Sequence, residues 1–431
     1  MKKLITLFAL IGFGFSVNAL AVPKIQTWTS DAGAKVMFVP ADSLPMVDVR
    51  VVFDAGGARD GDLPGLATFT NALLTEGAGE LDAAAFAENI ESRGIQIGSD
   101  SLRDMAWLTL RSLTEPEVLS VGLTRLSEAL AKPRFDQDAI ERIRDQMHAV
   151  LRQQEQSPSD IASREFYATL FAGHPYGVPT EGTKASVDKI NLDAIKAFHK
   201  KYYVAKNAVI SIVGAQTREQ AEQIANQVTR DLPQGEKAPL IAMPTQIKPV
   251  DKKIDYDSSQ SHVYLGMLGM SRHDPDYIPL YVGNQVLGGG SLVSLLGEEV
   301  RNKRGLSYSV YSYFSASRQP GPFVMVAQTK NTQVKEAADV MKQTLSKFAN
   351  ESLTEELLKD AKQNIVFGFP MQIANNSKMV GYISMIGFYD MPIDWLERLP
   401  RLVNEVTLDE VKDAFNRRVK VEDLSTVVVG G

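Results

Sequence analysis

Two stretches of this chain, one near the middle and one at the end, match each other in order and in chemistry. The first stretch consists of NLDAIKAFHKKYY at 191–203 followed by VISIVG at 209–214. The second consists of TLDEVKDAFNRRV at 407–419 followed by STVVVG at 425–430. Each pair is typical of an amphipathic helix followed by a buried strand that ends at glycine. Both halves also contain a helix that starts near a proline and a long helical hairpin. Because the similarity extends over roughly 200 residues in each half, we predict a duplicated domain.

The boundary between the two halves is expected in a proline-rich segment. Prolines stand at 233, 239, 244 and 249, in a stretch without hydrophobic periodicity. Such segments are typical of linkers, and a chain of 431 residues is too long for one ordinary hydrophobic core. We therefore predict an N-terminal domain over 22–232, a linker over 233–250 and a C-terminal domain over 251–431.

Each half is expected to be an α+β sandwich, in which helices pack on a mostly antiparallel sheet. In the first half, Asp62 is predicted to cap a helix that has Pro64 in its first turn and Gly77 after its end. The predicted strands are 26–29, 35–39, 47–53, 96–101, 105–112, 208–213, 262–267, 308–314, 322–328 and 425–429, and the other main helices are 82–93, 115–131, 137–154, 159–171, 192–203, 218–228, 333–349, 354–367 and 408–415.

The N-terminus has the features of a secretory signal. Lys2 and Lys3 precede an apolar run over 4–17, and an A-x-A cleavage site follows at 19–21. A membrane anchor is the alternative, but this run is shorter than the ~20 residues that a spanning helix needs. We expect cleavage of residues 1–21 after Ala21, no membrane span afterwards, and a periplasmic or secreted protein.

Composition excludes several classes of function. The chain has no cysteine, so it has no disulfide, thiolate metal site or cysteine nucleophile, and this is compatible with export. The formal net charge of −6 argues against a nucleic-acid partner, which would require a basic face.

The stretch Gly288–Phe314 combines three glycines, a short amphipathic helix and a tyrosine-rich strand. Arg301 lies near the end of the helix, and Tyr308 lies at the start of the strand. Gly305 stands between them, where a helix C-terminus favours a left-handed residue. The apolar residues at helical spacing are Leu292, Leu295, Leu296 and Val300.

This pattern resembles the C-terminal half of the insulinase/pitrilysin family of zinc peptidases, whose members carry an arginine and a tyrosine at this spacing. The resemblance covers almost the whole mature chain, including GHPYG at 173–177. It implies two homologous α/β-sandwich domains. In that family the pair binds the substrate backbone and helps to hold the tetrahedral intermediate. Arg301 and Tyr308 are therefore predicted to bind peptide, although each alone would be an ordinary helix-end cation or strand tyrosine.

The same resemblance reveals a missing metal site. Active members carry H-x-x-E-H on the first helix after the central strand, where two histidines hold zinc and the glutamate activates water. The family pattern G-x-A-H-F-x-E-H-x-L-x-x-G matches GLATFTNALLTEG at Gly65–Gly77, in which Thr68 and Ala72 replace the histidines and Asn71 replaces the glutamate. The later glutamate ligand is replaced by Gln153. Because these side chains are poor zinc ligands, the chain is expected to bind no metal.

The histidines offer no substitute site. The chain has five, at 148, 174, 199, 262 and 273, and no two lie within one helical turn. We interpret each of them as a surface or loop histidine.

The glycines Gly288, Gly289 and Gly290 have two open interpretations. They form no phosphate loop, because no G-K-[ST] follows at the required spacing. They either join two helices or form an open lip at which a peptide approaches the backbone. The non-catalytic subunit of mitochondrial processing peptidase, a member of the family, has a glycine-rich loop in this region that is implicated in substrate recognition.

The resemblance implies a non-catalytic, substrate-binding subunit of a heterodimeric zinc metallopeptidase. A homologous zinc-motif partner would supply the zinc and the general base, and Arg301 and Tyr308 would donate hydrogen bonds to the substrate. The substrate would be an unfolded peptide held by main-chain contacts like those of an added β-strand. One alternative is an enzymatically dead scaffold or peptide-binding protein. The other is a peptidase with a displaced metal site, against which the histidine positions argue.

Overall fold

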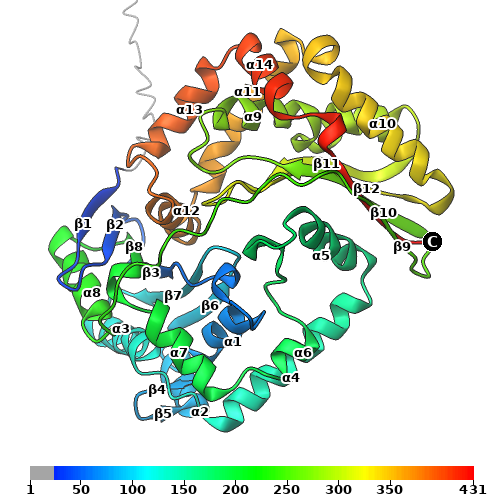
Figure 1. The fold of residues 1–431 in the computed structure, drawn as a ribbon. Coiled ribbons are helices and arrows are strands. Elements are labelled where there is room, and N and C mark those ends of the chain that lie inside the picture. Colours follow the sequence, from blue (N-terminus) through cyan, green and yellow to red (C-terminus); the bar gives the residue numbers. More distant parts are fainter. Residues whose placement is uncertain (1–23) are drawn as a thin grey trace, which may run out of the picture.

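The computed structural model describes residues 24–431, and the chain forms one large β-sheet in each half (Figure 1). The predicted signal at 1–21 lies outside the described residues. The first sheet contains, in spatial order, β1 (Gln26–Thr29), β2 (Lys35–Pro40), β8 (Ala208–Gly214), β3 (Met46–Phe53), β7 (Ala106–Leu113) and β6 (Gln96–Ser101). The second contains β11 (Ser307–Phe314), β12 (Pro322–Lys330), β10 (Gln260–Leu268), β13 (Ser425–Val429) and β9 (Asp251–Ile254).

The two sheets share one topology. The order β2-β8-β3-β7-β6 in the first corresponds to β9-β13-β10-β12-β11 in the second. In both sheets the first of these pairs is parallel and the other pairs are antiparallel. The predicted α+β class with mostly antiparallel sheets is confirmed.

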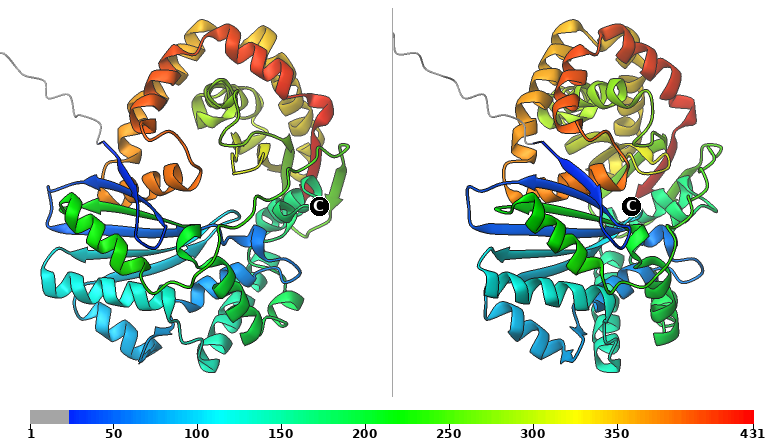
Figure 2. Two further views of the ribbon diagram at one scale, coloured as in Figure 1. Left: turned by 60° about the vertical axis from the view of Figure 1, so that its left-hand side comes forward. Right: turned by 90° about the vertical axis from the view of Figure 1, so that its left-hand side faces the viewer.

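Helices cover both faces of each sheet. Those of the first half are α1 (Leu66–Leu73), α2 (Ala83–Glu91), α3 (Pro116–Ala131), α4 (Gln137–Glu155), α5 (Pro158–Leu170), α6 (Lys184–Val187), α7 (Leu192–Tyr202) and α8 (Arg218–Thr229). Those of the second are α9 (Tyr277–Asn284), α10 (Val334–Lys347), α11 (Glu355–Gln372), α12 (Asn376–Phe388), α13 (Trp395–Glu405) and α14 (Leu408–Arg418). In the turned views of Figure 2 the C-terminal helices, coloured orange to red, arch over the second half.

Each half contributes one helix that packs on the sheet of the other half. Helix α12 of the second half packs against β3 and β8 of the first sheet, and α5 of the first half packs against β10 and β13 of the second (Figure 1). The strand sequences fit this arrangement, since alternate residues of a strand face opposite sides. In β2, Phe38 belongs to the core inside the first half, whereas Met37 belongs to the core that α12 shares. Within residues 24–431, neither sheet is therefore left with an open apolar face.

The segment 233–250 connects the halves without a helix or strand. Its backbone is nevertheless anchored on both sides. The Ala238 N–H donates to Asn207 Oδ1 at 3.0 Å, and Gln319 Nε2 donates to the Ile241 carbonyl at 2.6 Å. The prolines thus prevent regular structure, while side chains from both halves hold the segment against the body.

The start of α1 differs from the prediction. Asp60, not Asp62, satisfies the first turn, because its carboxylate accepts the Gly65 N–H and the Ala67 N–H, both at 2.7 Å. Gly65 takes a left-handed conformation at the N-cap, and the helix begins at Leu66. Burial raises the pKa of Asp60 to about 7, although the two N–H donors favour its charged form.

No helix in residues 24–431 combines the length and the hydropathy that crossing a bilayer requires.

Candidate functional site

The positions of the zinc motif on α1 are occupied by side chains that hold the fold. Thr68 Oγ1 donates to the Thr180 carbonyl at 2.8 Å. Asn71 is only 1% exposed. Its amide nitrogen donates to the Asp100 carbonyl at 2.8 Å, and its amide oxygen accepts the Tyr203 hydroxyl at 2.9 Å. The position of the general base is therefore a neutral hydrogen-bonding residue that connects α1 with β6 and with Tyr203, the residue that follows α7.

The remaining positions of the motif do not fit a zinc ion either. The methyl group of Ala72 packs on the core of the first half, and Gln153 is exposed on α4. Across residues 24–431, no group of three or more histidine, aspartate or glutamate side chains lies close enough to hold a metal ion. Since structural and catalytic zinc sites use imidazole, thiolate or carboxylate donors, the residues present do not form one.

One histidine is not at the surface as expected. His199 is buried on α7, where its Nε2 lies 2.8 Å from the Leu130 carbonyl and its ring stacks on Tyr203. Burial lowers the pKa of His199, which favours the neutral ring. The apolar spacing of Ile195, Phe198 and Tyr202 on the same helix was the signal that its face points inward.

A pocket of about 530 Å³ lies in the second half and contains both residues of the predicted pair. Its walls are the π-helical turn Gln285–Gly289, the π-helical turn Gly297–Asn302 and the edge strand β11. The lining residues are Gly288, Gly289, Leu292, Gly297, Arg301, Tyr308, Ser309, Val310, Tyr311 and Ser312. Two of the three predicted glycines thus face the site, whereas Gly290 is not among the lining residues.

Arg301 lines this pocket, and no carboxylate in residues 24–431 forms an ion pair with it. The nearby Glu299 is neutralised by Lys303 and Arg304, each at 2.6 Å. The Arg301 guanidinium forms no hydrogen bond or ion pair with any residue that the structure describes. A guanidinium with free donors beside a pocket is suited to bind carbonyl or carboxylate oxygens.

Tyr308 is exposed to solvent at a bulge in β11. The pairing with β12 shifts between Ser307 and Ser309, so Tyr308 is an extra residue in a bulge. Its side chain is 86% exposed. Among residues 24–431, β12 is the strand that pairs with β11, and the other edge of β11 is open to an added strand except at Ser312, whose carbonyl accepts from Asn284.

The glycine-rich turn is docked tightly on this strand at Gly288. A Cβ at Gly288 would lie 2.3 Å from Ser312 Oγ and 2.5 Å from the Ser312 backbone nitrogen. Asn284 fixes the same point, because it donates to the Ser312 carbonyl at 3.1 Å and accepts the Ser312 hydroxyl at 2.7 Å. Gly288 therefore allows the glycine-rich turn to pack closely against β11. Gly289 is exposed, and the interpretation of the glycines as an open lip for a peptide stays a prediction there.

Sequence reasoning missed part of this pocket. Leu292 was placed on the apolar face of a helix, but it is 55% exposed because Ser291–Val293 forms a 3-10 turn instead of an α-helical one. Leu296 and Val300 are buried as expected. Tyr311, a further lining residue, is recognisable only once the bulge is known, since simple alternation along the strand would separate it from Tyr308.

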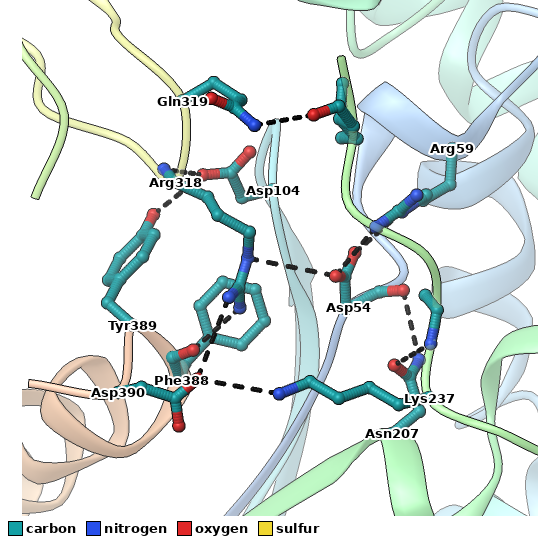
Figure 3. Close-up of polar contacts among 12 residues, drawn as sticks. Asp54, Arg59, Asp104, Asn207, Lys237, Arg318, Gln319, Phe388, Tyr389 and Asp390 are labelled. Carbon is teal, nitrogen blue, oxygen red and sulfur yellow. Dashed lines mark hydrogen bonds and ion pairs between the residues drawn. The ribbon is translucent and has the colours of Figure 1, made fainter. Parts of the chain in front are cut away.

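A second feature without a sequence signal is a polar cluster between the halves (Figure 3). The buried Asp104 carboxylate accepts the Tyr176 hydroxyl at 2.6 Å, the Arg318 backbone N–H at 2.8 Å and the Tyr389 hydroxyl at 3.1 Å. Burial raises the pKa of both tyrosines, so both hydroxyls stay protonated and donate. Tyr176 belongs to the predicted GHPYG loop, which therefore helps to fix the second half.

Comparisons with known proteins agree with this geometry. The family model described as "Insulinase (Peptidase family M16)" matches residues 36–184, and the model described as "Peptidase M16 inactive domain" matches residues 189–365. Together these two regions contain α1, the connecting segment and the Arg301–Tyr308 pocket.

Three relatives extend the match over almost the whole chain. A Helicobacter pylori protein described as a non-peptidase homolog is 30% identical over 433 residues, covering 100% of this chain and 98% of its own. A Bacillus subtilis protein described as an uncharacterized zinc protease is 22% identical and covers 94% of this chain and 98% of its own. A crystal structure of a peptidase M16 inactive domain from Pseudomonas fluorescens has 38% identity and a TM-score of 0.91, over 94% of this chain and 97% of that one. The chain therefore belongs to the insulinase family, peptidase family M16, as an inactive-type member whose first helix lacks the zinc motif.

Proposed function

We propose that this protein is the non-catalytic, peptide-binding subunit of a two-chain zinc peptidase. The observation that carries the proposal is the shared pocket of Arg301 and Tyr308. One side chain has no partner among the described residues and the other is almost fully exposed, although both belong to a well-packed half. The neutral side chain of Asn71 supports the same division of work, because catalysis would have to come from another chain.

The peptide would bind in extended form along the free edge of β11. Its main-chain groups would pair with the strand, and Arg301 would donate charge-assisted hydrogen bonds to a peptide carbonyl or to the oxyanion that develops from it. The Tyr308 hydroxyl would add one donor. A homologous partner with the H-x-x-E-H motif would hold zinc, which activates water when bound there. No cofactor is assigned to this chain.

The place of action that we propose is based on the N-terminal sequence. Residues 1–21 would direct the chain out of the cytoplasm and be removed after Ala21. We therefore place the two-chain enzyme in the periplasm or outside the cell, where its substrates would be unfolded peptides.

The experiment compares the chain alone with the chain mixed with a zinc-motif family member from the same organism. Cleavage of a quenched fluorescent peptide is measured for wild type, Arg301→Ala and Tyr308→Phe. Arg304→Ala is the matched control, because Arg304 is a neighbouring cation that already pairs with Glu299 and does not line the pocket. We expect cleavage by the mixture only, with a loss of about 10²–10³ for Arg301→Ala and no loss for the control.

The other outcomes identify the alternatives. Equal cleavage by the Arg301→Ala and wild-type mixtures, or no effect of this chain on its partner, indicates a scaffold or a simple binding protein. Cleavage by the purified chain alone indicates a peptidase with a displaced metal site. Either result refutes the proposal.

A further inference from the structure

A second pocket, of about 430 Å³, lies where the two halves and the connecting segment meet. It is distinct from the Arg301–Tyr308 pocket. Its cationic lining residues come from separate segments: Lys35 from β2, Lys206 from the 3-10 turn Ala205–Asn207, Lys237 from the connecting segment, and Arg318 from the loop between β11 and β12. Figure 3 shows Lys237 and Arg318 directed toward the same space beside Asp390.

The charges in this pocket are not balanced. Of the two lining carboxylates, Asp54 is already bound by Arg59 through contacts of 2.7 and 2.8 Å. Asp390 alone remains, and it is shared by Lys35 at 3.0 Å, Lys237 at 3.5 Å and Arg318 at 4.0 Å. The fourth cation, Lys206, pairs with Glu236, which is 83% exposed at its side chain and does not line the pocket. The pocket walls therefore carry an excess of positive charge.

The guanidinium of Arg318 is under-satisfied for a buried group. Its side chain is 12% exposed and makes one side-chain hydrogen bond, from Nη2 to the Phe388 carbonyl at 2.7 Å. Its buried Nε has no hydrogen-bond partner among residues 24–431, since the nearest carboxylate oxygen, on Asp54, is 3.9 Å away. Buried polar groups normally have an acceptor, so the Arg318 guanidinium retains donor capacity for a bound anion.

Asp390 is held in a costly backbone conformation at the same place. It follows the end of α12 with φ of +53°, where glycine is the usual residue. Partial burial raises the pKa of its carboxyl, but the hydrogen bond from Lys35 and the nearby cations outweigh burial and hold it below the usual range. The charged Asp390 carboxylate offsets one of the three cations that share it, so positive charge remains for a bound anion.

We propose that this pocket binds a small multivalent oxyanion, either a polyphosphate or a polycarboxylate, between its lysines and Arg318. The pocket volume is within the range of small-molecule sites, and flexible lysines with one planar guanidinium suit such anions. Because the cations belong to both halves and to the segment between them, the bound anion links the three parts. Binding should therefore raise the thermal stability of the whole chain.

The test uses the full mature chain, with pyrophosphate and citrate as probes against sodium chloride of equal ionic strength. Calorimetric titration gives the affinity, and thermal unfolding gives the shift in midpoint. The site variant is Lys206→Ala/Lys237→Ala, both exposed residues whose removal leaves the buried contacts of Arg318 intact. The matched control is Lys335→Ala/Lys359→Ala, which makes the same change in net charge outside the pocket.

We expect saturable one-to-one binding of at least one probe, weakened at least about tenfold in the site variant and unchanged in the control. Binding of pyrophosphate alone assigns the site to phosphoryl ligands, and binding of citrate alone assigns it to carboxylates. Equal weakening in both double variants, or no binding of either probe up to about 1 mM, overturns the proposal.

Discussion

Replacing Asn71 by alanine tests whether the former position of the general base is now structural. The substitution removes the acceptor of the Tyr203 hydroxyl and the donor to the Asp100 carbonyl. The loss at Tyr203 occurs in the interior, since Tyr203 is fully buried and Asn71 is nearly so, whereas the hydrogen bond to the Asp100 carbonyl is only partly buried. A catalytic residue would show the opposite behaviour, because its removal commonly leaves stability unchanged or increased.

The cost follows from the two partners that stay behind. A buried polar group that loses its hydrogen bond costs about 1–3 kcal/mol, and the two groups together with the small void give about 3 kcal/mol, most of it from the buried Tyr203 hydroxyl. This is a large share of the ~5–15 kcal/mol that stabilises a typical domain. Asn71→Ala should therefore lower the urea midpoint strongly without changing the slope of the transition.

The assay is urea unfolding followed by circular dichroism, with a double-mutant cycle. Asn364→Ala, an exposed position on α11, is the control and should stay within about 0.5 kcal/mol of wild type. Combining Asn71→Ala with Tyr203→Phe should show a coupling of about 1–3 kcal/mol. A loss below about 1 kcal/mol for Asn71→Ala, or additive effects in the cycle, refutes the reasoning.

Two further predictions concern stability. Asp60 has a pKa of about 7 in the folded chain and an ordinary pKa near 3.8 when unfolded. The free energy of unfolding of wild type should therefore fall by roughly 4 kcal/mol relative to that of Asp60→Asn as the pH rises from about 4 to about 7. Urea midpoints of the two proteins that run parallel across this range would contradict the prediction. Gly288→Ala should cost about 1–3 kcal/mol because its Cβ meets the Ser312 backbone, whereas Gly368→Ala, with no neighbouring atom within 4 Å in α11, should stabilise by about 0.5–1 kcal/mol. Thermal unfolding of the two glycine variants checks the contrast, and equal shifts would refute it.

Local patterns were sufficient for much of the fold. The buried strand β8 and the terminal strand β13 lie where continuous apolar runs predicted them. Gly305 does adopt a left-handed conformation, with φ of +62°, and its N–H bonds to the Arg301 carbonyl at 2.9 Å. These features depend on residues close together in the chain, which is why period and capping rules describe them.

Features set by distant contacts were beyond such rules. The cap of α1 depends on a loop that brings Asp60, instead of Asp62, to the first turn. Helix α12 packs on the sheet of the other half, and this cannot be read from its own apolar face. The bulge that exposes Tyr308 arises from pairing with β12, so the pair with Arg301 was predicted only through the family resemblance.

The account depends on a chain that binds peptide at the Arg301–Tyr308 pocket without a metal of its own. The most direct measurement is equilibrium binding of a fluorescent unstructured peptide to the isolated mature chain, by anisotropy, with and without added zinc. We predict saturable binding that zinc does not change and that Arg301→Ala weakens at least about tenfold. Unchanged binding by Arg301→Ala, or stoichiometric zinc with cleavage of the peptide by wild type alone, would contradict the account.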